Sequence, residues 1–176
     1  FTNTEGLNGN GGFKASSEKL KFLVRLGGNS HVDYKTGNSE RVTNSRFNEK
    51  DLKTGLAYQL TNFKTELRYN YNNSELGIPE EIGEQSTERS AIEPFQDITS
   101  HILSSKSNIY FKNSSLQAII GFTRNDRKEF ENHEHGAEES IAEEEEAPAL
   151  DMKLETLSYN LQYNLAKIGA VETIIG

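Results

Sequence analysis

The strongest constraint in this sequence is a two-residue alternation of apolar and polar side chains. From Leu157 to Leu165, every odd position is leucine or tyrosine, and every even position is serine, asparagine or glutamine. From Phe63 to Tyr71, phenylalanine, threonine, leucine and tyrosine alternate with lysine, glutamate, arginine and asparagine. Successive side chains of a β-strand point to opposite faces, whereas a helix would mix these residues around its circumference. The pattern therefore predicts strands with one apolar and one polar face.

The links between the alternating runs are alternately short and long. Short links rich in turn-forming residues lie near residues 16, 61, 114 and 167, and the last three recur about 53 residues apart. Long links cover about 35–48, 76–98 and 130–150. We predict eight strands, at residues 6–14, 19–33, 48–60, 63–75, 99–112, 116–129, 151–164 and 170–176.

Two architectures can use such strands. A soluble β-sandwich covers its apolar faces with a second sheet, and its loops have no reason to alternate in length. A membrane β-barrel turns its apolar face to lipid and joins its strands by short periplasmic turns and long extracellular loops. Strands of about 10–14 residues exceed the usual 5–6 of soluble sheets. The sequence favours an all-β, antiparallel up-and-down transmembrane β-barrel, with about eight strands of a larger barrel present.

Charge is concentrated in one segment. The chain has 176 residues and a net charge of −8, and residues 131–146 contain eight glutamates and no lysine or arginine. The remaining 19 acidic residues balance 19 basic ones. The segment predicts a solvated acidic extracellular loop at 130–150 and argues against a nucleic-acid binder. Cysteine is absent, no apolar run approaches the roughly 20 residues of a transmembrane helix, and no catalytic motif is present, so we do not expect an enzyme.

The acidic segment also contains the best candidate metal ligands. His133 and His135 are two residues apart, and their neighbours Glu131 and Glu134 supply carboxylates. Imidazole and carboxylate groups suit zinc or copper, although a fixed tetrahedral site needs three or four ligands. A solvated loop that binds nothing specifically is the alternative.

Two further histidines are weaker candidates. His31 and Asp33 lie on one face of a predicted strand near its extracellular end and form a candidate substrate site. The alternative is a polar strand end with no ligand. His101 stands alone in its strand, which predicts a structural or lumen-facing role.

Several segments resemble TonB-dependent outer-membrane receptors of the Bacteroidetes type. The resemblance covers nearly the whole chain, and its main pieces are HVDYKTGNSERVTNSRFNEKDLKTGLAYQ (31–59), ELRYNYNNSELGIPE (66–80), PFQDITSHILSSKSNIYF (94–111), GFTRNDRKEFE (121–131) and PALDMKLETLSYNLQYNLAKIGAVETIIG (148–176). It implies a 22-stranded barrel with a plug in its lumen, in the outer membrane of a Gram-negative bacterium. It also implies TonB as the energising partner, acting through the plug.

We therefore expect residues 1–176 to be a partial barrel domain without its plug and remaining strands. The expected function is uptake of a metal ion or metal chelate, such as iron–siderophore, zinc or copper, with outer-membrane lipid as a partner and no resident cofactor. The start at Phe1 and the end within an alternating run at Gly176 fit a fragment. The alternatives are a non-energised porin and a soluble cell-surface β-sandwich that binds carbohydrate or protein.

The metal hypothesis makes a direct prediction. Replacing both His133 and His135 by alanine should reduce metal capture at low external concentration, because the imidazoles supply the preferred ligands for zinc and copper. Uptake of zinc, copper and iron by metal-starved cells is the measurement. Equal uptake by the parent and the double variant at limiting metal would contradict the hypothesis.

Overall fold

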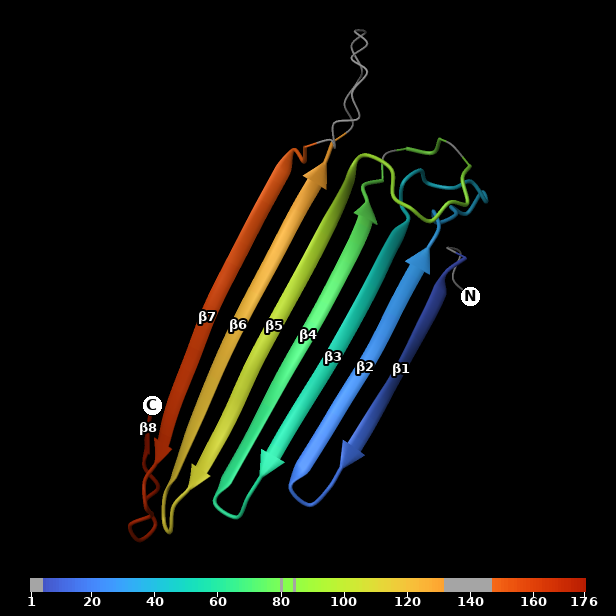
Figure 1. The fold of residues 1–176 in the computed structure, drawn as a ribbon. Helices are drawn as coiled ribbons and strands as arrows, with labels where there is room; N and C mark the ends of the chain where they lie inside the picture. The colour runs from blue at the N-terminus through green and yellow to red at the C-terminus, as the bar shows by residue number, and fades with distance from the viewer. Residues whose placement is uncertain (1–4, 80, 84, 132–146) are drawn as a thin grey trace.

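The computed structural model describes residues 5–79, 81–83, 85–131 and 147–176, and they form a single antiparallel sheet. Its eight strands follow the order of the sequence, so every strand pairs with its immediate neighbours in the chain (Figure 1). This up-and-down arrangement confirms the predicted all-β topology. The sheet is open, with β1 at one edge and β8 at the other. No helix that could cross a membrane occurs in the described part of the chain.

The strands are long. Their bounds are Leu7–Ser16 (β1), Leu20–His31 (β2), Phe47–Gln59 (β3), Phe63–Gly77 (β4), Phe95–Tyr110 (β5), Ser115–Phe130 (β6), Leu150–Asn164 (β7) and Ile174–Ile175 (β8). The alternating residues that predicted these strands pair without interruption from β1 to β7. Cross-strand packing of side chains on one face and a continuous hydrogen-bond ladder together hold such a sheet.

Short and long connections lie at opposite ends of the sheet (Figure 1). The turns after β1, β3 and β5 lie at one end, which we call the turn end. Residues 32–46, 78–94 and 131–149 connect β2 to β3, β4 to β5 and β6 to β7, and the strand ends that they join lie at the other end, the loop end. The predicted alternation of short and long connections therefore separates them in space. In an up-and-down sheet, every second connection lies at the same end.

The eighth strand is much shorter than predicted. The sequence predicts a strand over residues 170–176, but only Ile174 and Ile175 pair with β7. The preceding turn is longer than four residues: Ile168 and Val171 bridge across Gly169, whose φ of +61° suits glycine. The returning chain therefore reaches β7 only at residue 174. The fifth strand is longer than the predicted 99–112. It begins at Phe95, because residues 95–98 also pair with β4 and β6.

The register places the alternating residues on two distinct faces. On one face, a row across β3 to β7 consists of Leu56, Leu67, Ser105, Ile120 and Tyr159. We call this the apolar face and the opposite side the polar face. The apolar face is not covered by a second layer of described residues: Tyr159 is 85% exposed and Leu157 is 70% exposed. The two-layer packing of a β-sandwich is thus absent from the described residues.

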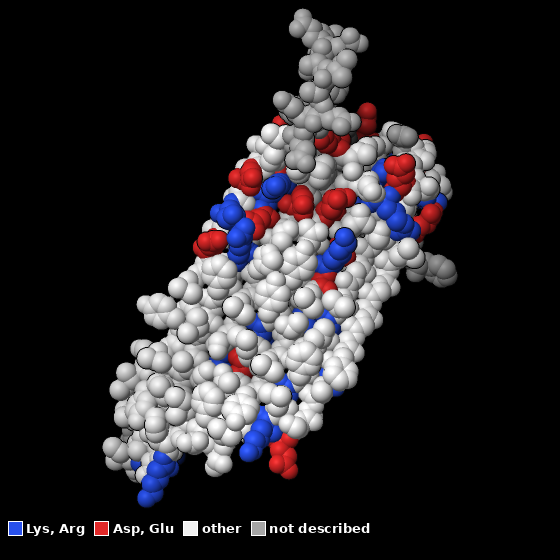
Figure 2. Space-filling model, viewed as in Figure 1, with Lys and Arg blue, Asp and Glu red and all other residues white. Residues whose placement is uncertain are grey.

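The apolar face changes character towards the loop end. Leu103, Phe122 and Leu157 form one row, and the next row consists of His101, Arg124 and Glu155. Beyond it, β5 to β7 place further aspartate and lysine residues opposite one another. Figure 2 shows charged side chains gathered towards the loop end, above a broad surface with few charges. The apolar surface is thus a band with a sharp boundary.

Among the described residues, the only fully buried side chains lie at the loop end. They are Val32, Asp33, Asn44 and Arg46, and only Val32 is apolar. A hydrophobic core of the usual kind is therefore absent from the described residues, because a single sheet cannot bury either face against itself.

Two glycines test how tightly the loop end is packed. A Cβ added at Gly77 would lie 2.3 Å from the backbone oxygen of Asn44, whereas a Cβ at Gly11 would meet nothing within 4 Å. Gly77→Ala should therefore destabilise the protein by about 1–3 kcal/mol, as overpacking does. The measurement is denaturant unfolding in detergent, with Gly11→Ala as the matched control. Equal stability of the two variants would show that the contact is unimportant.

Candidate functional site: the loop cap and the polar face

The loops 32–46 and 78–94 pack together at the loop end, and we call them the loop cap (Figure 1). Its centre is an ion pair within the first loop. Arg46 donates from Nη2 to Asp33 Oδ2 at 2.6 Å and from Nε to Asp33 Oδ1 at 3.1 Å. The side chains are 2% and 0% exposed, respectively. Such a bidentate pair fixes the loop geometry, because each buried charge requires the other.

The side chain of Asn44 joins the two loops. Its Nδ2 donates to the carbonyl oxygens of Ile92 at 2.8 Å and Pro94 at 2.6 Å, and its Oδ1 accepts from the Ile92 backbone N–H at 3.1 Å. Arg89 extends the connection to the sheet by donating to the Ser30 carbonyl oxygen at 2.8 Å. The described residues of the loop at 78–94, which lacks a periodic pattern, are held to the first loop and to β2 by these polar contacts.

Glu5 attaches the start of β1 to the same cap. Its Oε1 accepts from Lys35 Nζ at 2.9 Å and from Arg41 Nη2 at 2.6 Å. The hydrogen bond from Lys35, followed by that from Arg41 and by both positive charges, lowers the pKa of Glu5 below its ordinary value of 4.5. These attachments are therefore fully present above pH 4.5 and are lost as the pH falls through the lowered pKa.

The predicted substrate residues His31 and Asp33 lie near each other in the chain but have different surroundings. His31 ends β2, stacks on Phe47 with ring centroids 4.5 Å apart, and its Nε2 lies 3.1 Å from Asn8 Oδ1. Asp33 lies beyond the strand, with both carboxylate oxygens bonded to Arg46. In this arrangement the Asp33 carboxylate stabilises the loop cap rather than facing an open space.

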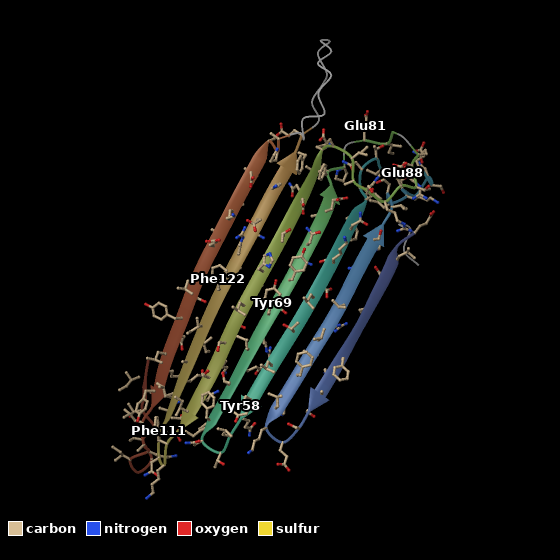
Figure 3. The ribbon with its side chains drawn as sticks, in the orientation of Figure 1. Tyr58, Tyr69, Glu81, Glu88, Phe111 and Phe122 are labelled. Carbon is tan, nitrogen blue, oxygen red and sulfur yellow. The ribbon has the colours of Figure 1, made fainter. Side chains whose placement is uncertain are left out.

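Among the described residues, two histidines lie in strands: His31 in β2 and His101 in β5. His101 lies on the apolar face, in register with Tyr71 and Arg124, and therefore does not point to the polar side. Its Nδ1 lies 2.8 Å from the hydroxyl of Tyr69, and its ring centroid lies 5.2 Å from that of Tyr71. Figure 3 labels Tyr69 within this part of the sheet. His101 thus has aromatic neighbours at the boundary of the apolar band.

The predicted metal ligands lie largely outside the described residues. This applies to His133, Glu134 and His135, whereas Glu131 is described and exposed, directly after the end of β6. Within the described ranges, no group of three or more histidine, aspartate or glutamate side chains could hold a metal ion.

Near the loop end, the polar face carries carboxylates held by amides. Glu49 accepts from Asn29 Nδ2 at 3.0 Å and from Asn72 Nδ2 at 2.7 Å, across three neighbouring strands. Asp51 follows on the same face, and its carboxylate lies over Gly27: a Cβ added there would be 2.5 Å from Asp51 Oδ1. This half of the polar face is acidic and its Glu49 carboxylate is already hydrogen-bonded.

Near the turn end, the polar face is basic. A hollow of about 580 Å³ between β1 and β4 is lined by the cationic residues Lys14, Lys19, Lys21, Lys53, Lys64 and Arg68, together with Glu18 and Glu66. The sequence alternation predicts that Lys64, Glu66 and Arg68 lie on the polar face, but it does not predict this cluster. In the sequence, lysines occupy polar positions of four separate alternating runs. Only the register of the strands places these lysines around the same hollow.

Comparison of the chain with protein-family models, with curated proteins and with solved structures found no match.

The ion pair in the loop cap gives a stability prediction. Arg46→Ala should destabilise the protein by about 3–5 kcal/mol, because it leaves the Asp33 carboxylate buried without a counter-charge. Arg68→Ala is the matched control: it breaks an ion pair with Glu66 in which Arg68 is 64% exposed, and exposed pairs contribute only about 0–1 kcal/mol. Denaturant unfolding in detergent measures both, and similar losses would refute the role of the buried pair.

Proposed function

We propose that this chain forms part of the wall of a TonB-dependent outer-membrane receptor that imports a metal ion or metal chelate. In this proposal the apolar face meets lipid, the polar face lines the conduit, and the loop cap stands at the extracellular entrance. Metal-chelate import, TonB coupling and the 22-strand barrel come from the sequence resemblance. The membrane wall is inferred from the two faces of the sheet.

The observation that supports the membrane wall best is the exposed apolar face. Rows of leucine, isoleucine, phenylalanine and tyrosine run across β2 to β7 with no second layer of described residues against them. In water this surface would be costly, at about 25 cal/mol for each Å² of apolar area left exposed. Lipid tails would remove that cost without a second sheet.

The height of the apolar band also fits a membrane. The apolar positions of the last long run extend from Leu157 to Leu165, which is roughly 26–30 Å at about 3.3 Å per residue. With the strands tilted by about 40°, the height becomes roughly 20–23 Å, close to the ~25 Å band of outer-membrane barrels. Above it, the row of His101, Arg124 and Glu155 would lie at the headgroup level.

The separation of the connections supports the orientation. In outer-membrane barrels, short turns face the periplasm and long loops face outside. The turn end would therefore be periplasmic, and the loop cap extracellular. Polar bonds within the loop cap, such as Arg46 to Asp33, give that entrance a defined shape.

A porin would have the same wall, and it is the second candidate. The basic and acidic halves of the polar face would suit an open channel as well as a plugged one. A soluble β-sandwich, in contrast, would need a second sheet against the apolar rows, and the described residues form only one sheet.

Two lysine substitutions on neighbouring residues test the membrane wall. Leu161→Lys places a charge in the centre of the apolar band, whereas Asn160→Lys places the same charge on the polar face of the same strand. The first should cost about 2–4 kcal/mol in lipid vesicles and the second close to zero, because only the first exposes a charge to hydrocarbon. Unfolding by denaturant in vesicles measures the difference. Equal costs, or a protein that is monomeric in water without detergent, would contradict the membrane wall.

Coupling to TonB needs a separate experiment. Metal-starved cells carrying the intact gene are compared with cells that also lack TonB, and uptake of iron, zinc and copper is followed in each. An energised receptor requires TonB, so uptake should fall to the level of a strain lacking the receptor. Uptake that persists without TonB would favour the porin.

A further inference from the structure

We propose that a second hollow, at the loop end of the apolar face, binds the zwitterionic head of a single phosphoethanolamine lipid. In this proposal the lipid phosphate lies at Lys50 and the lipid ammonium group at Glu75. The choice of a lipid rests on the proposed function, because it takes the apolar band as the lipid-facing surface. The arrangement of charges rests only on β1 to β4.

This second hollow has a volume of about 610 Å³, and we call it the boundary hollow. Sites for small molecules usually measure about 300–1,000 Å³. Ser90 of the loop cap borders it. Its lining on the apolar face comes from two successive rows of the sheet: Gly9, Gly28, Lys50 and Asn73 form the first, and Ser30 and Glu75 belong to the next row towards the loop end.

The floor of the boundary hollow carries no side chains on β1 and β2, where Gly9 and Gly28 lie opposite each other. A Cβ added at Gly9 would meet nothing within 4 Å, and one at Gly28 would only touch the Glu49 backbone oxygen at 3.5 Å. Neither glycine has a positive φ. Since neither crowding nor backbone conformation requires glycine here, the clearance itself is the feature, and glycine within a strand often marks the close approach of a ligand.

One positive and one negative charge at the boundary hollow have no counter-charge among the described residues. Lys50 is exposed and forms no ion pair or side-chain hydrogen bond there. Glu75 forms no ion pair, and its carboxylate accepts one hydrogen bond, from the Ala91 backbone N–H at 3.1 Å. The other carboxylate that lines the hollow, Glu49, already accepts from two asparagines. Lys50 and Glu75 thus remain for a ligand that carries both signs.

The two charges have the spacing of a small zwitterion. Lys50 is in register with Asn73, and Glu75 is two residues further along β4, so Lys50 and Glu75 are diagonal neighbours about 7–8 Å apart. A phosphoethanolamine group carries its phosphate and its ammonium on a short ethylene link. The phosphate can accept from the Lys50 ammonium, while the ethanolamine ammonium donates to the Glu75 carboxylate.

The place of the boundary hollow favours a lipid over a free zwitterion. The row directly below it, towards the turn end, is Gly11, Leu26, Leu52 and Tyr71, and this row begins the apolar band. A Cβ at Gly11 would meet nothing within 4 Å, so β1 is also low there. An acyl chain that leaves the hollow can pass over Gly11 onto Phe13, which is 62% exposed. A head in the hollow and a chain on the band together describe one amphiphile.

Lipid binding to the full-length protein in detergent tests the site. The probes are dioleoyl-phosphatidylethanolamine, dioleoyl-phosphatidylcholine and free phosphoethanolamine, and native mass spectrometry measures the apparent Kd of each. The choline lipid carries the same charges but no N–H donor, so it should bind about fivefold more weakly than the ethanolamine lipid, and free phosphoethanolamine should bind more weakly still.

Three charge variants identify the residues. Lys50→Gln and Glu75→Gln should each weaken binding of the ethanolamine lipid by about fivefold, the effect of one charge near a lipid head. Lys128→Gln is the matched control: Lys128 is an exposed lysine on the same face and in the row of Glu75, but it lies two strands away from Glu75, outside the hollow. Its binding should equal that of the parent.

A fourth variant fills the floor. Gly9→Leu places a side chain in the boundary hollow without crowding the sheet, so the protein should fold and bind the ethanolamine lipid about tenfold more weakly. Ala15→Leu is its matched control, because it adds the same side chain to the same face of β1 near the turn end. Its lipid binding should remain unchanged.

The outcomes separate this inference from the proposed function. Unchanged lipid binding in both Lys50→Gln and Gly9→Leu overturns the site, even if Leu161→Lys confirms the membrane wall. Equal binding of the ethanolamine and choline lipids overturns the choice of head, and equally tight binding of free phosphoethanolamine overturns the choice of a lipid. A protein that is monomeric in water without detergent, yet binds the ethanolamine lipid through Lys50 and Glu75, supports the site and contradicts the membrane wall.

Discussion

The sheet depends on a continuous hydrogen-bond ladder between neighbouring strands. From β1 to β7 every strand is paired to its sequence neighbour, so no described strand needs a long crossover connection. The ladder satisfies the backbone hydrogen bonds of the strands, but no second layer of described residues covers either face of the sheet. The two faces differ sharply in polarity. An apolar medium on one side and water on the other match this division, because only the side chains distinguish the two sides.

The loop cap shows a different kind of stability. Its centre is polar, with Asp33, Arg46 and Asn44 buried beside Val32. Long loops without an apolar core can be ordered in this way, because each buried charge or amide is satisfied by a specific partner. The cap thereby gives the loop end of the wall a defined surface, whereas the turn end is shaped mainly by the short turns and by the lysines around the hollow.

The polar face differs in charge between its two ends: carboxylates lie near the loop end and lysines near the turn end. Glu49 is held by Asn29 and Asn72, so its charge is accommodated by the wall itself. Lys53 and Lys64 form no ion pair or side-chain hydrogen bond among the described residues.

The sequence alone determined the strands, their two faces and the alternation of turns and loops, because a two-residue period is a local property that backbone geometry imposes. It did not determine the short β8, where the turn around Gly169 extends further than its residues suggest. The sequence offers Asp33 either as a candidate substrate residue or as part of a polar strand end, and it does not reveal that Asp33 is buried in an ion pair with Arg46, thirteen residues away. The basic hollow required the tertiary structure, since Lys14, Lys53 and Lys64 come from three strands and only the register of the sheet places them along the same hollow.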